Sequence, residues 1–68
     1  MAFRVLIENP YQGSEIEHRA LDEYKAVEEA ENATGLMFDD LLADLREDGE
    51  IRWRDEETGR EVVVEREA

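Results

Sequence analysis

The chain contains no cysteine, and at 68 residues this absence decides how the fold can be held together. A domain of this size buries only about 60% of the surface that its unfolded chain exposes, so small domains often rely on disulfides or a bound metal. Here disulfides, zinc fingers, thiol redox motifs and a cysteine nucleophile are all excluded. We therefore expect a single domain over residues 1–68, held together by apolar packing, by oligomerisation or by its solvent.

Alternating apolar residues predict strands near both ends of the chain. Phe3, Val5 and Ile7 are spaced by two, as in a half-buried strand. The same spacing occurs around Trp53, and residues 61–65, a run of three valines between two glutamates, are predicted to form another strand. Residues 55–59, which end in a glycine, have the composition of a type I turn followed by a left-handed residue. We therefore expect the last two strands to form a hairpin.

The segment over residues 15–20 is compatible with two structures. Ser14 and Glu17 match a capping box, which would start a helix running to Asn32. Charged residues at 15, 17 and 19 instead alternate with the residues between them, which fits a strand that closes a hairpin with the first strand. We favour the strand on this pattern.

Two helices are predicted in the middle of the chain. Asp22 is available as an N-cap for the first, and Gly35 is a natural left-handed stop. The second helix has apolar residues at 38, 41, 42 and 45, the i, i+3, i+4, i+7 spacing of one helical face, and Gly49 ends it. This periodicity is the clearest in the chain.

Together these elements predict an α+β fold in the order ββααββ. We expect a four-stranded antiparallel sheet with both helices packed on one face. The expected core residues are Phe3, Val5, Ile7, Ile16, Val27, Ala30, Phe38, Leu41, Leu42, Leu45, Ile51, Trp53, Val62 and Val64.

The composition is strongly acidic, with 20 Asp and Glu against 8 Lys and Arg, a net charge of −12. Lys25 is the only lysine among these basic residues. Acid excess with few lysines resembles the proteins of salt-loving archaea; this resemblance is one of composition and indicates no defined family. The apolar N-terminal stretch is too short for a signal peptide or a membrane span, so we expect a cytoplasmic protein without membrane contact.

No catalytic, cofactor-binding or metal site is predicted. His18 is the only histidine, and no partner lies at the spacing of a metal site or a triad. Asp40, Asp44 and Asp48 share one helical face but lack the register of a calcium loop, so we interpret them, with Asp39, as a solvated acidic face. The four glycines are isolated and form no phosphate-binding loop.

The segment from Leu42 to Val64, a helix that ends at glycine and runs into a hairpin, resembles the last helix and wing of winged-helix DNA-binding domains. That resemblance would imply DNA binding by the second helix. The helix carries Asp39, Asp40 and Asp44 where a nucleic-acid reader needs Lys or Arg. We therefore do not expect direct nucleic-acid binding.

The arginines are unevenly distributed. Only Arg46 lies in a predicted helix; the other six lie in predicted strands or their connecting turn: Arg4, Arg19, Arg52, Arg54, Arg60 and Arg66. We expect the outer face of the sheet to combine these arginines with Leu6 and Val63 and with four glutamates: Glu15, Glu17, Glu61 and Glu65. One interpretation is an ordinary solvated sheet with cross-strand ion pairs. The other is a contact surface, with Arg4, Leu6, Arg19, Arg52, Arg54 and Val63 as its candidate residues.

The helical acids are not placed to stabilise their own helices. Glu28, Glu29 and Glu31 crowd the end of the first helix, where the dipole disfavours negative charge. We therefore expect a non-enzymatic interaction module adapted to high salt, which binds a protein partner or a second copy of itself through the outer sheet face. The alternative is an acidic DNA mimic that occupies a nucleic-acid-binding enzyme, and the third hypothesis is a winged-helix DNA-binding protein.

Overall fold

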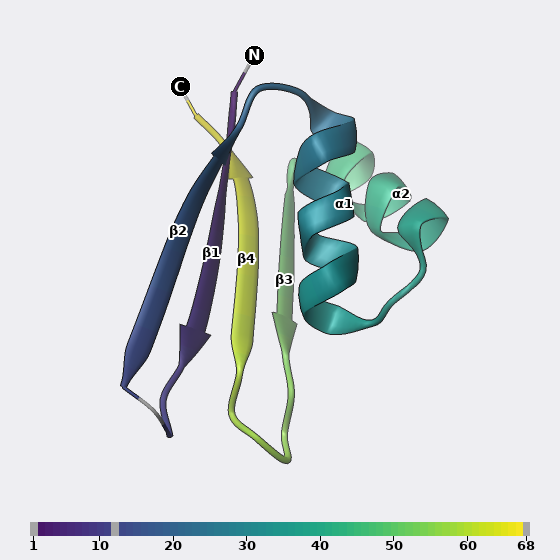
Figure 1. Ribbon diagram of the computed structural model, residues 1–68. Coiled ribbons are helices and arrows are strands. Elements are labelled where there is room, and N and C mark those ends of the chain that lie inside the picture. The colour runs from purple at the N-terminus through teal and green to yellow at the C-terminus, as the bar shows by residue number, and fades with distance from the viewer. Residues whose placement is uncertain (1, 12, 68) are drawn as a thin grey trace.

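The computed structural model describes residues 2–11 and 13–67 and has the predicted order of elements, ββααββ (Figure 1). The favoured interpretation of residues 15–20 as a strand is confirmed, because this segment pairs with the first strand along its whole length. The elements are β1 (Phe3–Asn9), β2 (Ser14–Ala20), α1 (Glu23–Thr34), α2 (Phe38–Asp48), β3 (Glu50–Arg54) and β4 (Glu61–Arg66).

The four strands form one antiparallel sheet in the order β2-β1-β4-β3. Each hairpin supplies two neighbouring strands, and the hairpins are joined by pairing between β1 and β4. The first and last strands in sequence therefore lie side by side at the centre of the sheet. The register sets Val5 opposite His18 on one side and Val64 on the other.

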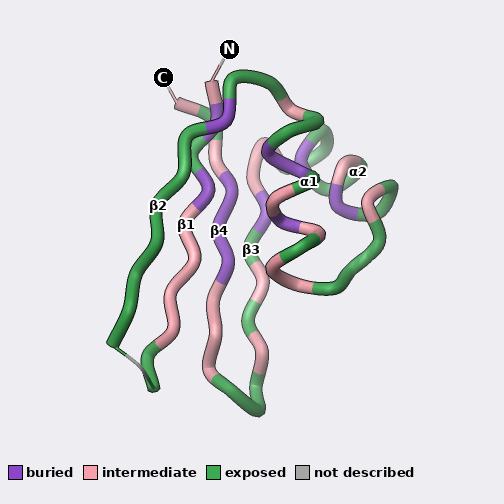
Figure 2. Tube along the Cα trace, viewed as in Figure 1, coloured by how far each residue is buried: buried purple, intermediate pink, exposed green. Residues whose placement is uncertain are grey.

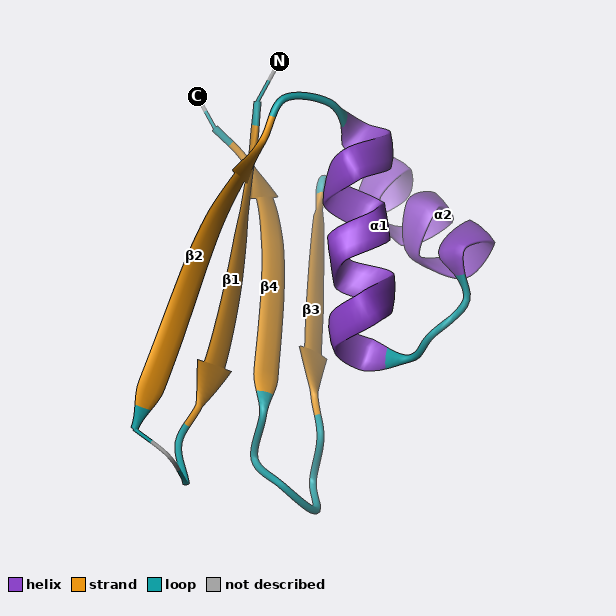
Figure 3. Cartoon of the chain, viewed as in Figure 1, coloured by secondary structure: helices purple, strands orange, loops and turns teal. Residues whose placement is uncertain are grey.

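Both helices lie on the same face of the sheet, as predicted (Figure 3). They cover the end of the sheet where the chain termini lie, and the two hairpin loops extend beyond them (Figure 1). Asp22 caps α1, because its Oδ1 accepts a hydrogen bond of 2.8 Å from the backbone N–H of Lys25. Gly35 ends α1 with a φ of 78°, and its N–H donates to the carbonyl of Glu31.

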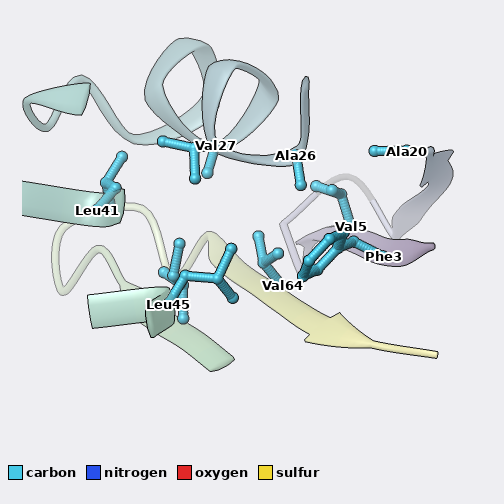
Figure 4. Close-up of a cluster of buried hydrophobic side chains, with 10 residues drawn as sticks. Phe3, Val5, Ala20, Ala26, Val27, Leu41, Leu45 and Val64 are labelled. Carbon is cyan, nitrogen blue, oxygen red and sulfur yellow. The ribbon is translucent and has the colours of Figure 1, made fainter. Parts of the chain in front are cut away.

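The core lies between the sheet and the helices (Figure 4). Leu41 and Leu45 from α2 and Val27 from α1 meet Val5 and Val64 from the central strands, all five at most 1% exposed. Small residues at three further core positions let α1 approach the sheet closely: Ala20, Ala26 and Ala30.

The predicted core is correct for its central members and wrong for Ile16. Ile7, Phe38, Leu42 and Trp53 are only partly buried, and Ile16 is 50% exposed. Ile16 lies on the edge strand β2, which is exposed along almost all of its length (Figure 2). A residue there has one neighbouring strand instead of two and lies near the hairpin end of the sheet, beyond the helices.

Candidate functional site

The register places all six candidate contact residues on the face of the sheet that no helix covers. Residues such as Val5 and Val64 point into the core, so their neighbours along each strand point the opposite way. We call this surface the outer face. In the strand order β2, β1, β4, β3 it has three rows: Arg19, Arg4, Glu65 and Glu50; then Glu17, Leu6, Val63 and Arg52; then Glu15, Glu8, Glu61 and Arg54.

The centre of the outer face is apolar. Val63 is only 9% exposed although no helix covers it, and Leu6, directly opposite on β1, is partly buried. Arg52 lies opposite Val63 on β3. The burial of Val63 therefore comes from its neighbours on the same face, because long arginine and glutamate side chains cover apolar surface with their stems.

Ion pairs surround this apolar centre. Arg4 pairs with Glu65 on β4 and, at 3.4 Å, with Glu17 on β2. Arg52 pairs with Glu50 of its own strand at 3.2 Å, and Arg19 pairs with Glu67 at 3.0 Å. These side chains are a third to two-thirds exposed, so each pair contributes no more than about 1 kcal/mol to stability. Within the described residues Arg54 has no ion pair.

Two of the arginines expected on the outer face lie elsewhere. Arg60, in the turn before β4, donates from Nη1 to the backbone carbonyl of Ala33 at the end of α1. Arg66 lies opposite Phe3 and so shares the side of the sheet that the helices cover. The strand alternation from Val64 predicts this position for Arg66. The outer face also includes Glu8 and Glu50, which the sequence analysis did not place there.

The helical layer is much more acidic than the outer face. Its two helices hold nine acidic residues and two basic ones, Lys25 and Arg46. Arg46 Nη2 pairs with Glu23 Oε1 at 2.6 Å, which joins the last turn of α2 to the first turn of α1. This hydrogen bond holds the pKa of the Glu23 carboxyl below its usual value. The four aspartates of the acidic face are exposed: Asp39, Asp40, Asp44 and Asp48.

The described residues contain no cluster of three or more His, Cys, Asp or Glu side chains able to hold a metal ion. His18 is exposed on β2 and borders an open hollow with Ile7 and Glu29. The Oε2 atom of Glu29 is buried and has no hydrogen-bond partner among the described residues. Neither helix, in the part of the chain that the structure describes, has the length and apolar character needed to cross a membrane.

The hairpin that resembles a wing is built into the sheet. β4 pairs with β1 on one side and β3 on the other, so the hairpin does not project beside the helix as a separate element. No family model, curated protein or solved structure matches the chain. The geometry of the outer face and the charge of the helices are therefore the observations that bear on function.

Proposed function

We propose that this is a small, non-enzymatic cytoplasmic protein that acts as an interaction module in high salt, and that it contacts its partner through the outer face. The observation that carries this proposal is the gathering of four arginines around the Leu6 and Val63 pair on the one sheet face without a covering layer. Elsewhere the surface is dominated by acid.

Arginine suits a contact surface for physical reasons. Its planar guanidinium pairs with carboxylates through two parallel hydrogen bonds and is less strongly hydrated than the ammonium of lysine. Arginine is accordingly enriched in protein interfaces, whereas lysine is depleted. An apolar centre with a charged rim is also the usual anatomy of an interface.

The acidic helices support the proposed adaptation to salt. Asp40 with Asp44 and Asp44 with Asp48 are like-charge pairs one helical turn apart, each unfavourable by a few tenths of a kcal/mol at low salt. Molar salt shortens the Debye length to about 3 Å and removes most of this repulsion. An acidic helical surface is thus tolerated best in concentrated salt.

The test is capture from cell extract in molar KCl by the tagged protein. We expect the double variant Leu6→Glu, Val63→Glu to lose the captured partner, because it places two charges in the apolar centre. The matched control Asn32→Glu, Ala43→Glu adds the same charge to exposed helical positions and is expected to retain the partner. Circular dichroism of both variants excludes unfolding as the cause. Equal capture by wild type and the Leu6→Glu, Val63→Glu variant would contradict the proposal.

A DNA-mimic inhibitor is the second candidate, favoured by the exposed aspartates of α2. A row of carboxylates imitates the phosphates of nucleic acid and attracts the basic groove of a DNA-binding enzyme. Capture that survives Leu6→Glu, Val63→Glu but is lost in Asp39→Asn, Asp40→Asn, Asp44→Asn would support this candidate instead.

A further inference from the structure

The three rows of the outer face have a charge pattern that is complementary to itself. The first row reads positive, positive, negative, negative across β2, β1, β4 and β3. The second begins with Glu17 and ends with Arg52, and the third begins with Glu15 and ends with Arg54. Residues at mirror positions of a row therefore carry opposite charges in most cases. Leu6 and Val63 are both apolar, and Glu8 and Glu61 are the one pair of like charge.

Building on the proposed function, we propose that the partner of the outer face is a second copy of the chain. The two copies pack face to face about a twofold axis that runs parallel to the strands, between β1 and β4. Such a rotation keeps each row at its own height and exchanges β2 with β3 and β1 with β4. Each residue therefore faces the residue at the opposite place in the same row of the other copy.

This arrangement satisfies every arginine of the outer face. Four of its six kinds of contact join an arginine to a glutamate, one joins two apolar residues, and only one joins like charges. The contacts between copies are Arg19 with Glu50, Arg4 with Glu65, Glu17 with Arg52, Leu6 with Val63, Glu15 with Arg54, and the like-charged Glu8 with Glu61.

A twofold axis perpendicular to the strands fits the same face less well. It would set each strand against itself and exchange the first row with the third. Glu17 would then face Glu17 and Arg52 would face Arg52, so both edges of the middle row would repel. Both axes leave the strands of the two sheets aligned, but only the axis parallel to the strands avoids these repulsive contacts.

The size of the face sets the expected strength of the dimer. Four strands spaced by about 4.8 Å, with three rows of side chains, give a footprint of roughly 20 Å by 20 Å. That is about 400 Å² per copy, below the roughly 800 Å² of a standard interface. The dimer is therefore weak and depends on concentration.

Concentrated salt favours such a dimer. Two copies that each carry a charge of −12 repel one another over long distances at low salt. Molar salt screens this repulsion, because the Debye length falls to about 3 Å, while pairs in direct contact and partly buried are screened much less. The face that meets its copy is also closer to neutral than the rest of the molecule, with six glutamates against four arginines.

Glu17 and Arg52 give the sharpest test, because they lie on opposite edge strands of one chain and meet only between copies. The twofold axis makes the contact between Glu17 and Arg52 twice in each dimer. In Arg52→Glu both contacts join two acidic residues, and in Glu17→Arg both join two basic residues. An equimolar mixture of the two variants restores both pairs. We expect sedimentation equilibrium in molar KCl, up to about millimolar protein, to show wild-type association, at least tenfold weaker association for each variant alone, and recovery in the mixture.

A matched control separates this pairing from general attraction between variants of different net charge. Lys25→Glu and Glu28→Arg make the same changes in charge on exposed positions of α1, and we expect both to associate as wild type does, alone and mixed. The twofold arrangement is overturned if the control mixture associates more strongly than either control alone to the same extent as the Glu17 and Arg52 mixture does. It is also overturned if the Glu17 and Arg52 variants have no effect on a wild type that does associate.

The test also separates the dimer from the proposed function. A wild type that stays monomeric at every concentration, while Leu6→Glu, Val63→Glu still loses its captured protein, removes the second copy and leaves the outer face as a surface for a different protein. If capture is the same for that variant and wild type, the proposed function fails whatever the sedimentation shows.

Discussion

The two faces of the sheet are built from the same strands and differ in what packs against them. On the covered face Val5 and Val64 are fully buried, because α1 and α2 supply the side chains that pack against them. On the outer face Val63 reaches nearly the same burial with no covering layer, through side chains of the sheet alone. One face is completed within the chain, and the other retains an apolar centre and exposed guanidinium groups that another molecule can complete.

Charge follows the same division. The helices carry acid on the surface that meets water, with a single arginine between them, whereas four of the seven arginines lie on the outer face. The helical arginine, Arg46, forms its ion pair within the fold. The arginines of the outer face are exposed to a similar degree, but their ion pairs lie along an uncovered sheet and leave the guanidinium groups accessible to a second copy.

The largest expected effect is a difference in the free energy of unfolding between truncations on the two faces of the sheet. Leu41→Ala removes a side chain that is 1% exposed and should cost about 2–5 kcal/mol, as for truncations in a packed core. Leu6→Ala on the outer face should cost about 1 kcal/mol or less, the range of cross-strand pairs. Urea denaturation at a dilute concentration, where association does not contribute, measures both.

A small domain has roughly 5–15 kcal/mol of stability in total, so Leu41→Ala is expected to remove a large share of it and to unfold most readily at low salt. Both variants are therefore measured in molar KCl, where we expect them to be folded, so that their free energies of unfolding can be compared. Equal losses at the two positions would show that the outer face is as much a part of the core as the covered face, and that the division drawn between them does not hold.

Much of the fold is readable from the sequence because each element has its own local signal. Strand alternation, the Asp22 cap, the stop at Gly35 and the apolar spacing of α2 all indicated elements that the structure contains. The alternation also assigned the six candidate residues to one face. These signals are local, so they depend only on backbone geometry and on the burial of one side of an element.

The parts that sequence reasoning missed depend on how elements meet. Ile16 follows the strand pattern but is half exposed, because α1, at 12 residues, is about 18 Å long and the seven-residue strands extend to about 24 Å. The rows of the outer face need the order β2-β1-β4-β3, which alternation along single strands does not contain. The self-complementary pattern of charge is therefore visible only in the register, whereas Glu8 and Glu50 follow the same alternation as Leu6 and Arg52 and needed no strand order to be placed.

The second prediction concerns the acidic helices and their response to salt. We expect the melting temperature to rise between about 0.1 M and molar KCl, because screening relieves the repulsion among the helical acids. Each kcal/mol relieved raises the midpoint by roughly 4–8 °C for a domain of this size. The variant Asp44→Asn, Asp48→Asn removes a like-charged pair from the C-terminal half of α2, where the dipole does not favour negative charge, and should be more stable at low salt and respond less to added salt. Thermal melts followed by circular dichroism measure both quantities.

A variant matched in net charge shows whether the position of the acids matters. Glu56→Gln, Glu57→Gln removes two charges from the β3–β4 loop and leaves the helices unchanged. We expect it to keep most of the wild-type response. A wild-type midpoint that is flat or falls with salt contradicts the proposed salt adaptation, and equal responses of the two variants assign the effect to total charge instead of to the helices.

The smallest expected effect concerns the ion pair that distinguishes Arg46 from the arginines of the sheet. The hydrogen bond from Arg46 lowers the pKa of Glu23 in the folded state below its unfolded value. A carboxyl with a lowered folded pKa contributes stability that is present above the unfolded pKa, near 4.5, and is lost as the pH falls through the folded pKa. The advantage of wild type over Arg46→Gln should therefore be constant near pH 7 and shrink below about pH 4.5.

The difference between wild type and variant is the quantity to measure, because protonation of the other acidic residues changes the stability of both proteins together. Lys25→Gln is the matched control: it removes the same charge from a helix, but the Lys25 ammonium lies 3.8 Å from the Glu28 carboxylate in an exposed pair. Its difference from wild type should vary less with pH than that of Arg46→Gln. If the two variants follow the same pH dependence in urea denaturation, Arg46 acts only through its charge. In that case the hydrogen bond between the helix ends gives it no role beyond that of the exposed arginines on the sheet.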